Sequence, residues 1–248
     1  MKIFPLKTGT IHCNKSIITL GRDFDQWIDI PSVAWLVETS NKMILVDTGM
    51  CDSARADRYH YSGSCQKENE RIDRVLDQKG YSVDDIDMVI FTHLHWDHCS
   101  NCDLFRKATF YIQKREIVFA RDPIPPYYHS YESAEVGLKA PFQSLKFEVI
   151  DGDCDIAPGI RILTTFGHSP GHQSVQVTTE RGRYVIAGDA IMSYENLERD
   201  DKKGVAYRMI GRYMDFEKTW RSLEKITAAA DFILPSHDDR VFEKSFYA

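Results

Sequence analysis

The stretch Met88-Val-Ile-Phe-Thr-His-Leu-His-Trp-Asp-His98 joins a short apolar run to three histidines and an aspartate. The apolar run is typical of a buried strand. In an extended segment alternate side chains share a face, so we expect His93, His95 and Asp97 to converge at the strand end and His98 to turn toward a second point. Buried imidazoles and carboxylates need polar partners, and a metal ion supplies them. The stretch therefore predicts a metal site.

Further candidate ligands follow other predicted strands. The turn Gly167-His-Ser-Pro-Gly-His172 contains two glycines and a proline that can aim His172 inward, whereas His168 is expected to support the turn. Asp189 and His237 each stand where an apolar run gives way to a loop. Because sites are usually built where strands end, this recurrence strengthens the prediction.

The whole chain alternates short apolar runs with helical patterns. Strands are predicted at 33–38, 43–47, 88–92, 109–112, 147–150, 160–165, 174–178, 184–188 and 232–234, and helices at 70–79 and 215–230. This mixture predicts an α+β fold in which two sheets are covered by outer helices. With no break in composition, residues 1–248 are expected to form one domain.

Charge and composition exclude several classes of protein. The net charge is -6 and no run of Lys or Arg occurs, so nucleic acid is not an expected partner. No apolar stretch approaches the length of a membrane span, and polar residues interrupt the first 20 residues, where a signal peptide would be apolar. We therefore expect no membrane association and a cytoplasmic location. Cys99 and Cys102 form a C-x-x-C pair, but no second such pair exists and this one directly follows the metal motif. Both are therefore interpreted as ordinary thiols near the site, not as a redox pair or zinc knuckle.

The candidate ligands together resemble the pattern of the metallo-β-lactamase superfamily, whose fold is a four-layer αββα sandwich. The motif His93-x-His95-x-Asp97-His98, followed by His172, Asp189 and His237, matches all seven ligand positions of its dinuclear members. The resemblance implies one metal held by His93, His95 and His172, and a second held by Asp97, His98 and His237, with Asp189 bridging both. It also implies that Asp47 orients a ligand histidine.

Within the superfamily, the chain is most similar to the N-acyl-homoserine lactonases that degrade quorum-sensing signals. The likeness includes Asp47-Thr-Gly-Met50, the metal motif and the G-H-S-P-G-H-Q-S segment that ends at Ser174. Those lactonases carry a substrate-contacting tyrosine three residues after the bridging aspartate. Here Met192 stands at that position, and Tyr194 is the nearest tyrosine.

The resemblance implies a metal-dependent hydrolase that opens a lactone or ester of a small molecule. In this hypothesis a hydroxide bridging two divalent cations attacks the ring carbonyl, and Asp97 passes a proton to the leaving oxygen. Zinc is the expected metal, with iron, manganese or cobalt as alternatives. The protein is expected to be a monomer or a homodimer.

Two long segments without a clear pattern, 20–30 and 122–141, are either substrate walls or packed surface loops. The residues expected to form a groove for an acyl chain are Phe24, Trp27, Tyr127, Tyr128 and Met192, with Tyr194 as a candidate catalytic residue.

Other functions share parts of the pattern. A glyoxalase II-like thioesterase has the same ligands, but no extra basic region that would hold glutathione is visible near the C-terminus. Metallo-β-lactamases commonly place Cys where Asp189 stands and do not keep His98. Flavo-diiron oxidoreductases usually place Glu where His95 stands. A metal-free binding module on the same fold conflicts with the intact ligand set.

Overall fold

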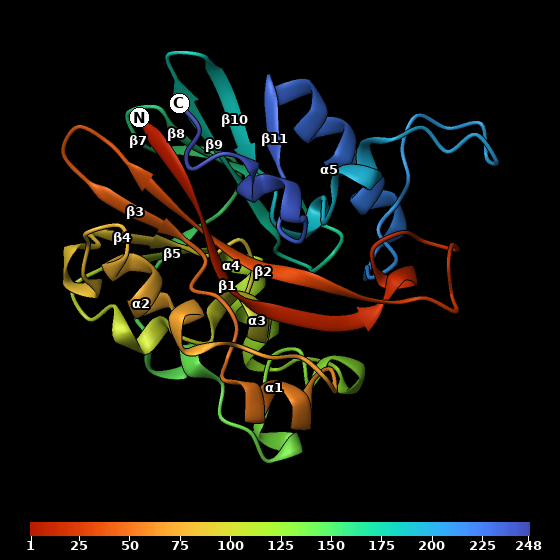
Figure 1. The fold of residues 1–248 in the computed structure, drawn as a ribbon, viewed down its shortest axis with the longest axis horizontal. Coiled ribbons are helices and arrows are strands. Elements are labelled where there is room, and N and C mark those ends of the chain that lie inside the picture. Colours follow the sequence, from red (N-terminus) through yellow and green to blue (C-terminus); the bar gives the residue numbers. More distant parts are fainter.

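The computed structural model describes residues 1–248 and contains two β-sheets that face each other (Figure 1). The first sheet has six strands in sequence order, and the second has five in the order β11-β10-β9-β8-β7. The strands of the first sheet are β1 (Lys2–Asn14), β2 (Trp27–Glu38), β3 (Met43–Val46), β4 (Met88–Ile90), β5 (Thr109–Gln113) and β6 (Phe147–Ile150). Those of the second are β7 (Cys154–Ala157), β8 (Ile160–Thr164), β9 (Gln173–Thr179), β10 (Gly182–Ile186) and β11 (Phe232–Leu234).

Helices cover the outer faces of both sheets. The first sheet is flanked by helices from the first half of the chain, and α5 packs on the second sheet (Figure 1). The α-helices are α1 (Ser53–Tyr59), α2 (Ile72–Asp77), α3 (Trp96–Cys99), α4 (Lys114–Arg121) and α5 (Phe216–Ala229), and ten short 3-10 helices lie between elements. The predicted α+β sandwich of four layers is confirmed. No helix combines the length and apolar composition that crossing a bilayer requires.

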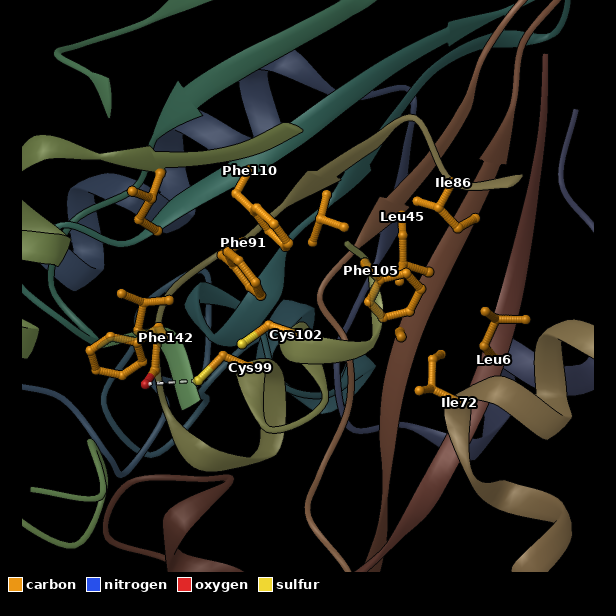
Figure 2. Packing of buried hydrophobic residues seen from close by; sticks show 14 of the residues in the cluster. Leu6, Leu45, Ile72, Ile86, Phe91, Cys99, Cys102, Phe105, Phe110 and Phe142 are labelled. Carbon is orange, nitrogen blue, oxygen red and sulfur yellow. Dashed lines mark hydrogen bonds between the residues drawn. The ribbon is translucent and has the colours of Figure 1, made fainter. Parts of the chain in front are cut away.

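The alternation of strand side chains builds the layers. In β2, Trp35 and Val37 point into the cluster between the two sheets, whereas Ala34 and Leu36 point toward the helices that cover the first sheet. The cluster beneath those helices contains 21 buried residues, and Figure 2 shows part of it around Leu45. Each strand of the first sheet thus contributes to two hydrophobic layers, which fixes its register.

Replacing Leu45 with Ala is expected to lower the free energy of unfolding by about 2–5 kcal/mol, because Leu45 is fully buried and the cavity would fill only partly. Val118→Ala is the control, since Val118 is 64% exposed and its loss should change the same quantity by less than about 0.5 kcal/mol. Urea unfolding of metal-loaded proteins measures both. Equal values for the two variants would contradict the packing described here.

The first 38 residues form a long hairpin, of which the sequence patterns predicted only the strand at 33–38. Strand β1 pairs with β2 along its whole length, and the register shifts between Lys7 and Gly9. This bulge interrupts the regular alternation by which a strand is recognised. The positive φ of Gly9, 145°, is one that only glycine adopts readily, and a Cβ there would lie 2.2 Å from the sulfur of Met50. The hairpin extends beyond the sheet, and its far end reaches the site described next (Figure 1).

Candidate metal centre

Two pairs of parallel strands bring the candidate ligands to one edge of the sandwich. Strands β3 and β4 are parallel neighbours, so Asp47 and Thr92 follow them side by side. Strands β10 and β11 are also parallel, so Asp189 and His237 emerge together from the second sheet. Because parallel strands end at the same edge, residues far apart in the sequence converge there.

The first donor group consists of three histidine nitrogens. His95 Nδ1 lies 3.0 Å from His93 Nε2 and 3.0 Å from His168 Nε2. All three side chains are buried. Three imidazoles from two loops therefore meet at one point, a donor set that suits zinc and other transition metals.

The second donor group combines two histidines with two carboxylates. His98 Nε2 lies 3.5 Å from Asp97 Oδ2, and His237 Nε2 lies 3.7 Å from the same oxygen. Asp189 completes this group, whose ligand atoms lie within 4.8 Å of one another.

Asp189 connects the two groups, with one oxygen toward each. Its Oδ2 lies 3.3 Å from His168 Nε2 and 4.0 Å from His93 Nε2. Its Oδ1 lies 3.1 Å from both His98 Nε2 and His237 Nε2. The structure thus places Asp189 where the sequence predicted a bridging ligand.

The structure brings His168, and not the predicted His172, into the first group. The Nε2 of His172 accepts a hydrogen bond from the Asp189 backbone N–H at 2.9 Å, and its Nδ1 lies 2.8 Å from Thr165 Oγ1. Both ring nitrogens of His172 therefore have partners outside the donor group. The prediction that His172 is a ligand and His168 only supports the turn is corrected, because the two histidines exchange these positions.

A second correction concerns Asp97. Strand alternation predicted that Asp97 would join His93 and His95, but helix α3 begins at Trp96 and ends the extended conformation. The helical turn moves Asp97 toward His98 and His237, in the group that the family resemblance implied. The side chain of Trp96 stacks on the His60 ring, with 4.1 Å between the two ring centroids.

Outer hydrogen bonds fix which ring nitrogen of His98, His168 and His237 faces the site. The Nδ1–H of His168 donates to the Arg212 carbonyl at 2.8 Å, and that of His237 donates to the Pro31 carbonyl at 2.9 Å. His98 Nδ1 lies 2.8 Å from Asp47 Oδ2, which is the contact that the predicted orienting role of Asp47 requires. Carbonyl and carboxylate partners require a donor, so the Nε2 lone pair of each ring points into the site.

The convergence of these lone pairs fits bound cations. Burial lowers the pKa of His168 to about 4 despite the nearby Asp189 carboxylate, and burial also holds the pKa values of His93 and His95 well below the usual range. These rings are therefore neutral at pH 7. In the other group, His98 Nε2 is buried, has no hydrogen-bond partner and faces a carboxylate oxygen at 3.1 Å. A divalent cation between such donors satisfies all of them.

Glu116 on helix α4 holds both ligand loops and was missed in the sequence. Its Oε1 accepts hydrogen bonds from the Leu94 backbone N–H and from the Tyr131 hydroxyl. Its Oε2 accepts from the Ser169 hydroxyl and the Gly171 backbone N–H. The carboxylate is fully buried, so it ties the loop of His93 and His95 to that of His168. A single Glu in an amphipathic helix carries no signal of this role.

Glu116→Gln is expected to weaken metal binding by about 10- to 100-fold, because an amide cannot accept all four hydrogen bonds with the same two atoms. Titration with a chelator measures the affinity. Glu135→Gln is the matched control, since the Glu135 side chain makes no contact with either loop and its backbone N–H is capped by Ser133. Unchanged metal affinity in Glu116→Gln would remove the proposed link between the loops.

A pocket opens beside the two donor groups. The β1–β2 hairpin and the turn after β1 supply an apolar wall, and Tyr61, Ser130, Met192 and Arg212 complete the lining. The hairpin residues of this wall are Ile11, Cys13, Ile17, Ile18 and Ile30. The 20–30 segment thus lies beside the pocket, but it contributes only Ile30 to the lining.

Of the residues predicted to bind substrate, Met192 lines the pocket and the others do not. Phe24 and Trp27 are 68% and 61% exposed, and Trp27 stacks on His12. Tyr127 and Tyr128 are outside the lining, although the centre of the Tyr127 ring lies 6.4 Å from that of His95.

Tyr194 is also displaced from the predicted site. It packs at the edge of the cluster between the sheets, and the Arg240 guanidinium lies 4.7 Å from its ring. The loop after Asp189 turns into a 3-10 helix at Tyr194, which carries this side chain away from the pocket. The candidate catalytic role of Tyr194 is therefore corrected.

Comparison with known proteins agrees with this geometry. Residues 27–237 match the family model of the Metallo-beta-lactamase superfamily, which includes every residue of the two donor groups. The chain belongs to the metallo-beta-lactamase superfamily. Its fold and its buried His and Asp cluster are those of a metal-dependent hydrolase of this superfamily.

Relatives within the superfamily are N-acyl homoserine lactonases. A Bacillus enzyme of that name is 31% identical over 208 residues, covering 80% of this chain and 79% of the relative. An N-acyl homoserine lactonase of Azorhizobium caulinodans is 25% identical over 251 residues, covering 96% and 93%. A solved N-acyl homoserine lactone hydrolase, with the product N-hexanoyl-L-homoserine at its catalytic metal center, superposes with a TM-score of 0.78 at 25% identity and covers 98% and 95% of the two chains.

Proposed function

We propose that this protein hydrolyses the lactone ring of N-acyl homoserine lactones in a single catalytic domain spanning residues 1–248. The observation that carries the proposal is the position of Asp189, whose two oxygens face two separate groups of donors. A pocket with one apolar wall and one polar wall adjoins both groups, as an amphiphilic substrate requires. The named relatives support the same substrate class.

The proposal includes two divalent cations, most simply zinc. His93, His95 and His168 would hold one, Asp97, His98 and His237 the other, and Asp189 would contact both. Imidazole with carboxylate suits zinc, and iron, manganese or cobalt would also be accommodated. When bound, such cations polarise a carbonyl oxygen and lower the pKa of water. The chain itself provides the neutral rings, their orientation and the enclosure of the site.

Asp97 is the proposed proton carrier. Its carboxylate is 12% exposed in the pocket, whereas that of Asp189, which also borders the pocket, is 5% exposed and has histidine nitrogens and the Ser236 hydroxyl as its neighbours. Asp97 is therefore the more accessible carboxylate, and it would pass a proton to the departing alcohol oxygen of an opened ring.

Asp97→Asn is expected to lower kcat by about 10²- to 10⁴-fold, as loss of a general acid does, with a smaller loss of metal. The amide keeps an oxygen for the cation but cannot carry the proton. Turnover and metal content are measured on the same preparation. Full activity in this variant would rule out the proton-carrying role.

The function itself is tested by a hydrolysis screen on protein whose metal content has been measured. Acyl-homoserine lactones of several chain lengths, plain lactones, aryl esters and a glutathione thioester form the panel. We expect the acyl-homoserine lactones to give the highest kcat/KM. A higher value for the thioester would assign the protein to the glyoxalase II type instead.

All six cysteines are free thiols, which supports a cytoplasmic location, where disulfides are rare. Cys99 and Cys102 lie within the hydrophobic cluster of Figure 2 and not at the donor groups, which supports their interpretation as ordinary thiols. A monomer or homodimer is proposed, and light scattering measures which of the two forms.

A further inference from the structure

The polar wall of the pocket is built around Arg212. One guanidinium nitrogen donates to the Tyr61 hydroxyl at 3.1 Å, and another donates to Ser130 Oγ at 2.6 Å. The guanidinium also lies 5.8 Å from the centre of the Tyr127 ring. These contacts hold the side chain in one position beside the donor groups.

Both the main chain and the side chain of Arg212 lie beside the two donor groups. Its carbonyl accepts the Nδ1–H of His168, and its side chain lines the same pocket as His95, Asp97 and Asp189. The guanidinium is therefore positioned to meet any ligand that reaches the donor groups.

The side-chain partners of Arg212 are hydroxyl groups, in contrast with other part-buried arginines of this protein. Arg22 pairs with Asp200 and Arg55 pairs with Glu132. A guanidinium has five N–H donors, and the two hydroxyl contacts leave others for a ligand. A part-buried cation held by hydroxyls is suited to bind an acceptor oxygen that enters with the substrate.

Tyr61 adds a phenol to this wall. Its pKa is raised by burial and by the nearby Asp97 and Asp189, against the effect of Arg212, so the hydroxyl stays protonated at pH 7 and can act as a donor. Met192 is buried and apolar, packs near Trp96 and occupies the position where the lactonases are expected to carry a tyrosine. The pocket thus has its phenol on a different element, the segment after α1.

We propose that Arg212 and Tyr61 form a substrate-recognition arm that binds the carbonyl oxygen of the acyl amide, next to the lactone ring. The isoleucines of the hairpin lie in the same pocket and would hold the acyl chain. The proposal rests on the proposed lactonase function and deepens it. It makes the protein selective for lactones that carry an acceptor oxygen beside the ring over plain aliphatic lactones.

The test compares N-hexanoyl-homoserine lactone with γ-decalactone, which has an alkyl chain but no amide. In Arg212→Met, KM for the amide-bearing lactone is expected to rise about 10- to 100-fold, the effect of losing a hydrogen bond to a charged group. The kcat/KM for γ-decalactone should change less than about threefold. Tyr61→Phe should raise the first KM about 2- to 10-fold, and it keeps the ring in place.

Binding measurements provide a readout other than turnover. Calorimetric titration with N-hexanoyl-homoserine, the ring-opened product, measures its dissociation constant. In Arg212→Met this constant should rise by the same factor as KM for the amide-bearing lactone. Metal content is measured in every variant. Arg199→Met is the control, because Arg199 is exposed and pairs with Asp201 outside the pocket lining, and it should match the wild type throughout.

The outcomes separate the two proposals. If the wild type hydrolyses neither lactone, the proposed function fails, and the titration still tests the arm. If Arg212→Met weakens both lactones equally, or binds N-hexanoyl-homoserine as tightly as the wild type, the recognition arm is overturned. Absence of binding to the wild type overturns it as well.

Discussion

Replacing Asp189 with Asn is expected to abolish detectable lactone hydrolysis and to release metal. Asp189 is buried, one of its oxygens faces His168, and the other faces His98 and His237. Although burial opposes its ionisation, His237 and His98 hold the pKa of Asp189 well below the usual range, so it is charged at neutral pH. Asn keeps the shape and removes the charge that both cations would share.

The size of this effect follows from the burial of the site. Removing one member of a buried charge pair costs about 3–5 kcal/mol. At about 1.4 kcal/mol per tenfold, this corresponds to a loss of metal affinity of roughly a hundred- to several-thousand-fold. Elemental analysis and chelator titration measure the loss. Asp201→Asn is the matched control, since Asp201 is 84% exposed and pairs only with Arg199 at the surface. Retention of both metals by Asp189→Asn would show that this carboxylate does not join the two groups.

The second large effect distinguishes His168 from His172. His168→Ala is expected to remove one of the two cations. Loss of a residue that only orients a ligand lowers activity by about 10- to 100-fold, and the loss of kcat/KM in His168→Ala should be larger. His168 Nε2 is one of three nitrogens in the first group, and two nitrogens alone hold a cation poorly. The metal-to-protein ratio after dialysis is the measurement.

His172→Ala should behave differently. It leaves the Asp189 backbone N–H without its partner, which costs about 1–3 kcal/mol of folding stability, whereas the Thr165 hydroxyl keeps its contact with Ser174 Oγ. The metal-to-protein ratio should stay close to that of the wild type. If His172→Ala loses a cation and His168→Ala keeps both, the placement of these two histidines in the structure is wrong.

The sequence was sufficient for the fold and for most of the donor set. Side chains such as His93, Asp189 and His237 each follow a predicted strand, and parallel pairing brings such ends together. The choice between His168 and His172 could not be made from the sequence, because both lie in one turn. Which ring points inward depends on partners elsewhere, the carbonyl of Arg212 and the backbone of Asp189.

The pocket was less predictable than the donor groups. Aromatic content led to Phe24 and Trp27, which lie at the exposed end of the hairpin, whereas the wall consists of isoleucines. Arg212 and Tyr61 lie in segments without a helical or strand pattern. Their importance comes only from tertiary contacts between residues 151 positions apart.

The β1–β2 hairpin has a consequence for how substrate preference changes. The apolar wall is encoded almost entirely within the first 30 residues, and the donor groups begin at His93. Residues such as Ile17 and Ile18 can therefore be exchanged without altering any group that coordinates or orients a ligand atom. An enzyme arranged in this way can acquire a new chain-length range through one contiguous stretch of its gene, while its reaction chemistry is inherited intact.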